Sequence, residues 1–189
     1  GYYEEAIRSF EAALATEPQY PEAEKELGLA YRRRGEYQKG PDAEVMRNQD
    51  YEKAIEHLRR AILLSPNYDD ALSTLGGLYR RKGEYEKALE YYEGAFRAGP
   101  TSAYAAGNVA SLSWYLGKLD KARQYYMLTE WAATDSTRTT PAEVYWDYYD
   151  LALAQLALGK TEEARKSYVK AMGETPGVLQ FDSVLSVLY

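Results

Sequence analysis

Apolar and small residues recur along this chain in pairs of short segments that end at glycine or proline. Between residues 72 and 100, one such segment ends at Lys82-Gly83, and a second begins just past it and ends before Gly99-Pro100. Glycine permits the left-handed conformation that ends a helix, and proline cannot continue a helix. The pattern therefore predicts two helices joined by a tight turn.

The same plan repeats at a fixed period. Ala54, Ala88 and Ala122 are 34 residues apart, and so are Pro66 and Pro100. A fixed period of this length indicates a solenoid, in which each repeat is a helix pair that buries its apolar face against its neighbours. We therefore predict an all-α fold.

Residues 69–100 carry a distinctive set of large, small and turn-forming positions, namely Leu72, Leu75, Gly76, Tyr79, Gly83, Tyr85, Ala88, Tyr92, Ala95 and Pro100. This set resembles the tetratricopeptide repeat family at every position of the family's pattern. The resemblance implies a right-handed superhelical solenoid of antiparallel helix pairs. The small residues let paired helices approach closely, where a bulky side chain would cost roughly 1–3 kcal/mol.

The resemblance also divides the chain into repeats of one solenoid spanning residues 1–189. We expect a half repeat at 1–18, full repeats at 21–66, 69–100, 103–134 and 145–176, and a partial repeat or capping helix at 179–189. Gly35 and Ala54 are 19 residues apart where the pattern needs five, which leaves 14 extra residues at 37–50. This insertion is either a tolerated surface segment or an arm that contacts a partner. The half repeats predict a fragment of a longer protein.

Four local expectations follow from this division. Asp42 should cap a helix that runs through Val45 and Met46 into the second helix of its repeat. Ile7 and Phe10 should be partly uncovered, because their half repeat lacks its first helix. A looser joint should follow Trp131, with a polar loop over 135–142. The apolar segment 179–189 should present an end able to stack on another molecule.

Composition narrows the classes of partner. The net charge of −6 disfavours nucleic acid, because such proteins normally carry a basic footprint. No run of about 18 apolar residues is present, so no membrane span is predicted. The absence of cysteine excludes disulfides and thiolate sites. The sequence leaves the compartment open and favours a soluble protein of the cytoplasm.

The candidate chemistry is sparse. His57 is the single histidine, and with no cysteine it has no second strong ligand for a zinc site. Gly76-Gly77 lies at helix-packing positions, and no P-loop or dinucleotide-binding motif is present. We therefore predict no enzyme, with no catalytic, cofactor-binding or metal-binding residues, and we assign His57 to packing.

Binding is the function that the resemblance implies, because the first helix of each repeat lines a concave groove in this family. The corresponding residues here include small ones in the middle of the groove and aromatic ones in its C-terminal half. Tyr and Trp are frequent anchors of binding. The predicted partner-binding residues are Arg33, Ser73, Thr74, Arg81, Tyr104, Asn108, Ser111, Tyr115, Trp146, Tyr149 and Asp150.

Three functional hypotheses remain open. The favoured one is a scaffold that binds a partner peptide or helix in the groove, although Trp114 and Trp146 could instead pack against the 135–142 segment. The family's clamp for C-terminal carboxylates is absent, since only Lys25 of its five positions fits. The second hypothesis is a structural module that forms homo-oligomers through its repeat ends. The third is a regulatory segment of a larger enzyme.

Overall fold

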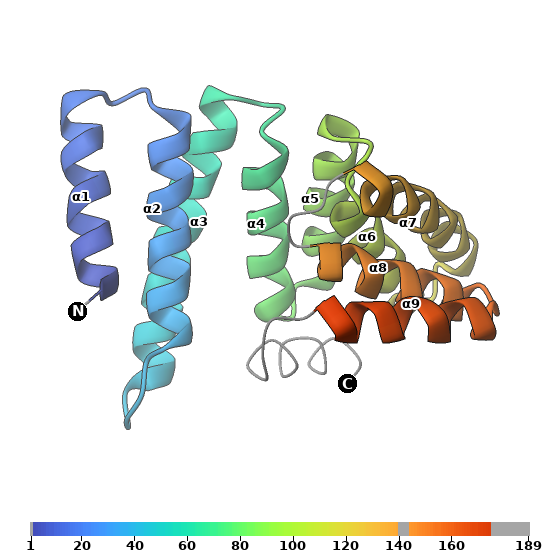
Figure 1. Cartoon of the computed structure of the whole chain (residues 1–189). Helices are drawn as coiled ribbons and strands as arrows, with labels where there is room; N and C mark the ends of the chain where they lie inside the picture. Colours follow the sequence, from blue (N-terminus) through green and yellow to red (C-terminus); the bar gives the residue numbers. More distant parts are fainter. Residues whose placement is uncertain (1, 140–143, 175–189) are drawn as a thin grey trace. The chain divides into compact units, whose positions relative to one another are not determined.

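The computed structural model describes residues 2–139 and 144–174, and within these ranges the chain consists of helices without any strand (Figure 1). The predicted all-α fold of paired helices is confirmed. The predicted partial repeat or capping helix at 179–189 lies outside the described residues. The chain forms two compact units, residues 1–99 and 100–189. Their boundary falls between the repeats predicted at 69–100 and 103–134, and the assignment of both units to a single solenoid stays a prediction.

The first unit contains helices α1 (Tyr2–Thr16), α2 (Pro21–Glu36), α3 (Ala43–Leu64), α4 (Asp69–Arg81) and α5 (Tyr85–Ala98). Helix α2 packs on α3 and α4 packs on α5, while α1 lies against α2 and α3 against α4. Sequence explains where several of these helices begin. Pro21 opens α2, where a missing N–H costs nothing, and two aspartates open α4, where negative charge favours the helix dipole.

Close packing within each pair depends on glycine. A Cβ placed on Gly28 would lie 2.8 Å from Leu58 Cγ and 3.1 Å from the backbone oxygen of Ala54. A Cβ on Gly76 would lie 3.0 Å from the ring of Tyr92. Both Leu58 and Tyr92 are fully buried. The two glycines therefore let large side chains of the second helix reach the backbone of the first.

The turns between paired helices use glycine for a different reason. Gly83 ends the α4–α5 turn with a φ of 76°, and Gly117 and Gly159 adopt the same conformation in the second unit. The N–H of Gly83 donates to Arg80 O at 3.1 Å, and the N–H of Glu84 donates to Tyr79 O at 3.0 Å. Only glycine adopts this left-handed conformation without steric cost.

The insertion at 37–50 lengthens the second helix of its repeat. Helix α3 begins at Ala43 and runs through Val45 and Met46, as predicted, and Asp42 is its N-cap residue, although the Asp42 side chain makes no capping hydrogen bond. The buried Asp50 anchors the added turns, because Arg34 Nε donates to its carboxylate at 3.0 Å and Gln38 Nε2 does so at 3.3 Å. A buried charge is tolerated when it is paired in this way.

The second unit contains α6 (Ala103–Tyr115), α7 (Leu119–Thr139), α8 (Val144–Ala157) and α9 (Thr161–Glu174). Helix α6 packs on α7, and α8 packs on α9. Helices α6 and α7 also contact α8. These helices are drawn from green through orange to red in Figure 1.

The predicted loose joint after Trp131 and the predicted loop over 135–142 are wrong for residues 135–139, which continue α7. Two causes are visible. Position 134, where the repeat pattern has proline, is threonine, and its Oγ1 donates back to Glu130 O at 2.6 Å. Ala132 and Ala133 are buried in a cluster with Leu151 of α8, so tertiary packing holds the extra turns. Residues 140–142 lie outside the described residues.

The prediction that Ile7 is partly uncovered is also wrong. Ile7 is 5% exposed, because α1 lies directly against α2 and this contact covers its apolar stripe. Phe10 is half-buried, as expected. A single neighbouring helix therefore suffices to bury one apolar position of α1.

Gly28→Ala should lower the free energy of unfolding by roughly 1–2 kcal/mol. Overpacking against Leu58 and the Ala54 carbonyl costs about 1–3 kcal/mol, and the gain in helix propensity returns up to about 1 kcal/mol. Gly94→Ala is the control, because its nearest new contact is an ordinary 3.5 Å to Leu72. Urea unfolding followed by circular dichroism measures both. A Gly28→Ala protein as stable as Gly94→Ala would contradict the close approach.

Candidate functional site

The predicted binding residues fall into two sets, one in each unit. Arg33, Ser73, Thr74 and Arg81 lie on α2 and α4 of the first unit, and the remaining seven lie on α6 and α8 of the second. The two sets therefore lie on different units, and the two surfaces have different chemistry.

The surface between α2 and α4 is crossed by ion pairs. Lys25 Nζ lies 2.8 Å from Asp70 Oδ2, and Arg81 Nε lies 2.8 Å from Glu36 Oε1. Burial lowers the pKa of Lys25, but its hydrogen bonds with Asp70 and Glu26 outweigh that effect and raise the pKa above its usual value. A ligand on this surface would compete with partners already in place.

The four predicted residues of this unit differ in how accessible their side chains are to a ligand. Arg33 is exposed in the last turn of α2, and Ser73 and Thr74 are half-buried on α4. Arg81 is exposed but engaged, since its Nη1 also donates to Gly77 O at 3.1 Å. Arg81 therefore has a structural role that the sequence did not reveal.

The insertion contributes to a pocket that sequence reasoning missed. Glu44, Arg47 and Asn48 of α3 lie beside the ends of α2 and α4, and the full lining is Glu36, Glu44, Arg47, Asn48, Tyr51, Arg81 and Lys82. The pocket carries charges of both signs. Its position could not be read from the sequence, because the insertion pattern does not say which neighbouring helix the added turns approach.

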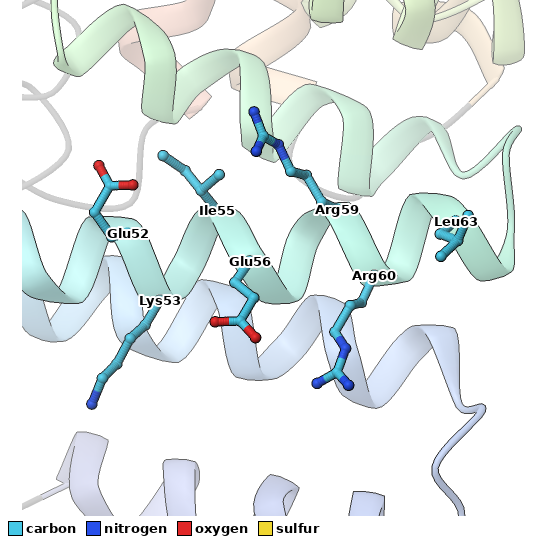
Figure 2. A pocket seen from close by; sticks show the side chains of 7 residues that line it. All are labelled: Glu52, Lys53, Ile55, Glu56, Arg59, Arg60 and Leu63. Atoms are coloured by element: carbon cyan, nitrogen blue, oxygen red, sulfur yellow. The ribbon is translucent and has the colours of Figure 1, made fainter.

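A second depression follows α3 alone and is shown in Figure 2, lined by Glu52, Lys53, Ile55, Glu56, Arg59, Arg60 and Leu63. Several of its polar side chains point away toward neighbouring helices. Arg59 Nη2 donates to the Tyr79 hydroxyl at 2.8 Å, and Lys53 Nζ lies 5.1 Å from the centre of the Tyr31 ring. These contacts are typical of the solvated outer face of a packed helix rather than of a ligand site.

The second unit presents a different surface, in which aromatic side chains are open to solvent. Tyr104 is 52% exposed, Trp114 59% and Tyr115 67% on α6, and Trp146 is 39% exposed on α8. Helix α6 has no charged residue, and α8 has only two aspartates. Solvated aromatic groups on an almost uncharged helix face indicate a surface that binds.

Two predicted members of this surface belong to the packed interior. Tyr149 is 8% exposed, and its ring meets Tyr168 of α9 edge-on at a centroid distance of 5.6 Å. Asn108 is also buried, and its Nδ2 donates to Tyr104 O at 2.9 Å. Ser111 is half-buried, with its Oγ 3.5 Å from the Tyr126 hydroxyl. Helical spacing alone did not separate the buried members of the predicted set from the exposed ones.

Asp150 is the charged group on the floor of this surface. Its Oδ1 would lie 3.8 Å from a Cβ on Gly107 of α6, so the glycine leaves room for the carboxylate between α6 and α8. Burial, with a smaller contribution from the charge of Asp147, raises the pKa of Asp150 to about 7. Asp147 itself accepts a hydrogen bond from Ser136 Oγ at 2.6 Å.

His57 has the packing environment that the sequence predicted. Its ring stacks on Tyr31 with an interplanar angle of 5°, and its Nδ1 lies 2.7 Å from Oε2 of the buried Glu24. Among the described residues, no group of three or more histidine, cysteine or acidic side chains is arranged to hold a metal ion. No helix in the described part of the chain is long and apolar enough to cross a membrane.

Comparison with known families agrees with this architecture. Three family models, each described as Tetratricopeptide repeat, match residues 1–44, 45–112 and 148–177. The chain belongs to the tetratricopeptide repeat family. Proteins of this family typically act as protein-interaction scaffolds, and none of the matching models represents a catalytic family.

Solved structures with the same fold include TTC0263, a thermophilic TPR protein of Thermus thermophilus, with 24% identity, a TM-score of 0.62, and coverage of 98% of this chain and 90% of that one. They also include "MamA 41-end from Desulfovibrio magneticus RS-1", with 20% identity, a TM-score of 0.59, and coverage of 92% and 85%. A further MamA crystal structure has 23% identity, a TM-score of 0.57, and coverage of 90% and 87%. At these identities the likeness concerns the fold. A search of the curated proteins finds no significant match.

Asp150→Asn should stabilise the protein more at pH 8 than at pH 5, by roughly 2–3 kcal/mol. Because the pKa of Asp150 is about 7 when folded and about 4 when unfolded, the unfolded state ionises first as the pH rises. This residue therefore reduces stability progressively between about pH 4 and pH 7, and the reduction persists above that range. Urea unfolding at both pH values measures it.

Asp120→Asn is the matched control, because Asp120 is an exposed carboxylate in the first turn of α7. Its effect on the free energy of unfolding should be small and similar at pH 5 and pH 8. An Asp150→Asn effect that is equally independent of pH would contradict a half-buried carboxylate with a raised pKa.

Proposed function

We propose that the face of α6 and α8 binds a segment of a protein partner, with Tyr104, Trp114, Tyr115 and Trp146 as its anchors. The observation that carries the proposal is the exposure of these four aromatic side chains on two adjacent helices of one unit. Rigid aromatic groups supply large contact area at low entropic cost, and they are enriched among the residues that dominate binding energy. Asn108, Ser111, Tyr149 and Asp150 form the floor of this surface.

In the first unit we assign a secondary contact to Arg33, Ser73 and Thr74, which reach the surface of α2 and α4. Arg81 joins them only if a ligand displaces its ion pair with Glu36. An acidic partner segment could do this, because the arginine fork binds carboxylates in the same geometry. The aromatic surface of the second unit exposes larger side chains to solvent and is therefore the principal site in this proposal.

Self-association is the second candidate function, and one specific feature favours it. Val169 and Met172 of α9 are 58% and 44% exposed, which leaves apolar surface on the last described helix. Sedimentation at high micromolar concentration separates the two functions. A monomer would remove self-association through this end and would leave partner binding in place.

Tyr104→Ala and Trp146→Ala should each weaken partner binding about tenfold or more, since loss of an anchor costs roughly 1–2 kcal/mol or more. Both proteins should fold, because Tyr104 and Trp146 are 52% and 39% exposed and neither is among the buried core residues. Trp131→Ala is the matched control, since Trp131 is 57% exposed on α7 rather than on α6 or α8. The measurement is quantitative affinity capture from source lysate, followed by titration of the captured partner.

The proposal requires a partner that is retained by the Trp131→Ala protein and lost from the Tyr104→Ala/Trp146→Ala double mutant. Circular dichroism spectra of all variants must match that of the parent. A partner that every variant retains with equal affinity would move recognition away from α6 and α8.

A further inference from the structure

The helices of the α6–α8 surface carry negative charge and no basic side chain. Helix α6 carries no charged side chain, and the charges of α8 are the carboxylates of Asp147 and Asp150. The first unit differs, because Asp70 and Glu36 on its corresponding helices are paired with Lys25 and Arg81. The second surface is therefore apolar, aromatic and negatively charged, and it would complement a ligand with a positive charge.

Asp150 is the carboxylate placed to meet such a ligand. Among the described side chains, the charged neighbour that affects its pKa is Asp147, which repels rather than neutralises it. The residues that this contact brings near Asp150, Gly107 of α6 and Thr129 of α7, are uncharged, since a Cβ on Gly107 would lie 3.8 Å from Asp150 Oδ1 and 3.6 Å from Thr129 Cγ2. A carboxylate removed from water without a cation is costly, and a bound cation would offset that cost.

The register of the two helices places aromatic side chains beside this carboxylate. Ala103 of α6 clusters with Tyr148 and Leu151 of α8, and Ala110 clusters with Ala154, so α6 and α8 run in the same direction. Tyr104 lies one turn before Gly107 on α6, and Trp146 lies one turn before Asp150 on α8. Both aromatic residues are exposed.

We propose that Asp150 receives the positively charged side chain of a lysine or arginine from the bound protein segment, between the aromatic side chains of Tyr104 and Trp146. The carboxylate accepts a charge-assisted hydrogen bond, and the aromatic faces attract the cation and cover its aliphatic stem. This inference rests on the proposed function of the α6–α8 surface and specifies its ligand as an apolar segment that carries one basic residue. The undescribed residues 140–143 and 175–189 contain no lysine, arginine or histidine, so they cannot supply this cation.

A peptide selection tests the proposal without knowledge of the natural partner. A phage library of random 12-residue peptides is selected in parallel on the full chain, on Asp150→Asn, and on the Tyr104→Ala/Trp146→Ala double mutant. The parent should enrich peptides with a lysine or arginine at a fixed distance from apolar residues. Asp150→Asn should enrich apolar peptides without the basic preference, and the double mutant should enrich neither.

A double-mutant cycle then measures the contact itself. The dissociation constant of one enriched peptide and of its Lys→Gln or Arg→Gln variant is measured against the parent, against Asp150→Asn and against the exposed-carboxylate control Asp120→Asn. The peptide substitution should weaken binding about tenfold with the parent and with Asp120→Asn. The same peptide substitution should have little effect on binding to Asp150→Asn, because this variant lacks the carboxylate that the basic side chain contacts.

Two outcomes would overturn the proposal, and they are distinguishable. In the first outcome, the selected peptides depend on Tyr104 and Trp146 but carry no basic residue, or their basic residue contributes equally to binding of the parent and of Asp150→Asn. Either result would remove the role of Asp150 and would leave the aromatic surface as the binding site. A selection that yields no peptide dependent on Tyr104 and Trp146 would remove the proposed function itself. Asp150→Asn replaces one oxygen by a nitrogen of similar size, so loss of folding should not obscure the result.

Discussion

The distance at which two paired helices can approach each other constrains the rest of this structure. Where Gly28 faces Leu58 and Gly76 faces Tyr92, the missing side chain lets a large residue of one helix rest on the backbone of the other. Both large residues are thereby fully buried, and their burial supplies hydrophobic stabilisation that short helices need because they are marginal in isolation. The contact is kept in both pairs although the insertion at 37–50 separates Gly28 from Leu58 by 30 residues and only 16 separate Gly76 from Tyr92.

A different contact shapes the candidate site. Gly107 and Asp150 meet between α6 and α8, the first helices of two successive pairs, where a Cβ on Gly107 would lie 3.8 Å from Asp150 Oδ1. Partial burial at this contact, with a smaller contribution from the charge of Asp147, raises the pKa of Asp150 to about 7. The packing of successive pairs thus places a carboxylate where a ligand could recognise it.

The α2–α4 face and the α6–α8 face differ in how their charges are paired, although the second unit has ion pairs elsewhere, such as Lys160 with Glu130. In the first unit acidic and basic side chains neutralise each other, as Lys25 and Asp70 do across α2 and α4, and Arg34 with Asp50 at the base of the insertion. In the second unit α6 and α8 carry aromatic groups and no basic residue. A surface with internal ion pairs resists binding of charged ligands, whereas an aromatic and negatively charged surface gains from them.

The sequence by itself determined the family, the helical class, the paired helices and the face on which the aromatic residues lie, because these follow from period, turn residues and helical spacing. Tertiary structure decided what periodicity does not encode. It extended α7 to Thr139 through the packing of Ala132 and Ala133, and it covered Ile7 with α2. It also buried Tyr149 against Tyr168 and placed Asp150 beside Gly107. Each of these outcomes depends on contacts between residues on different helices, and spacing along one helix fixes the direction of a side chain but not what it meets.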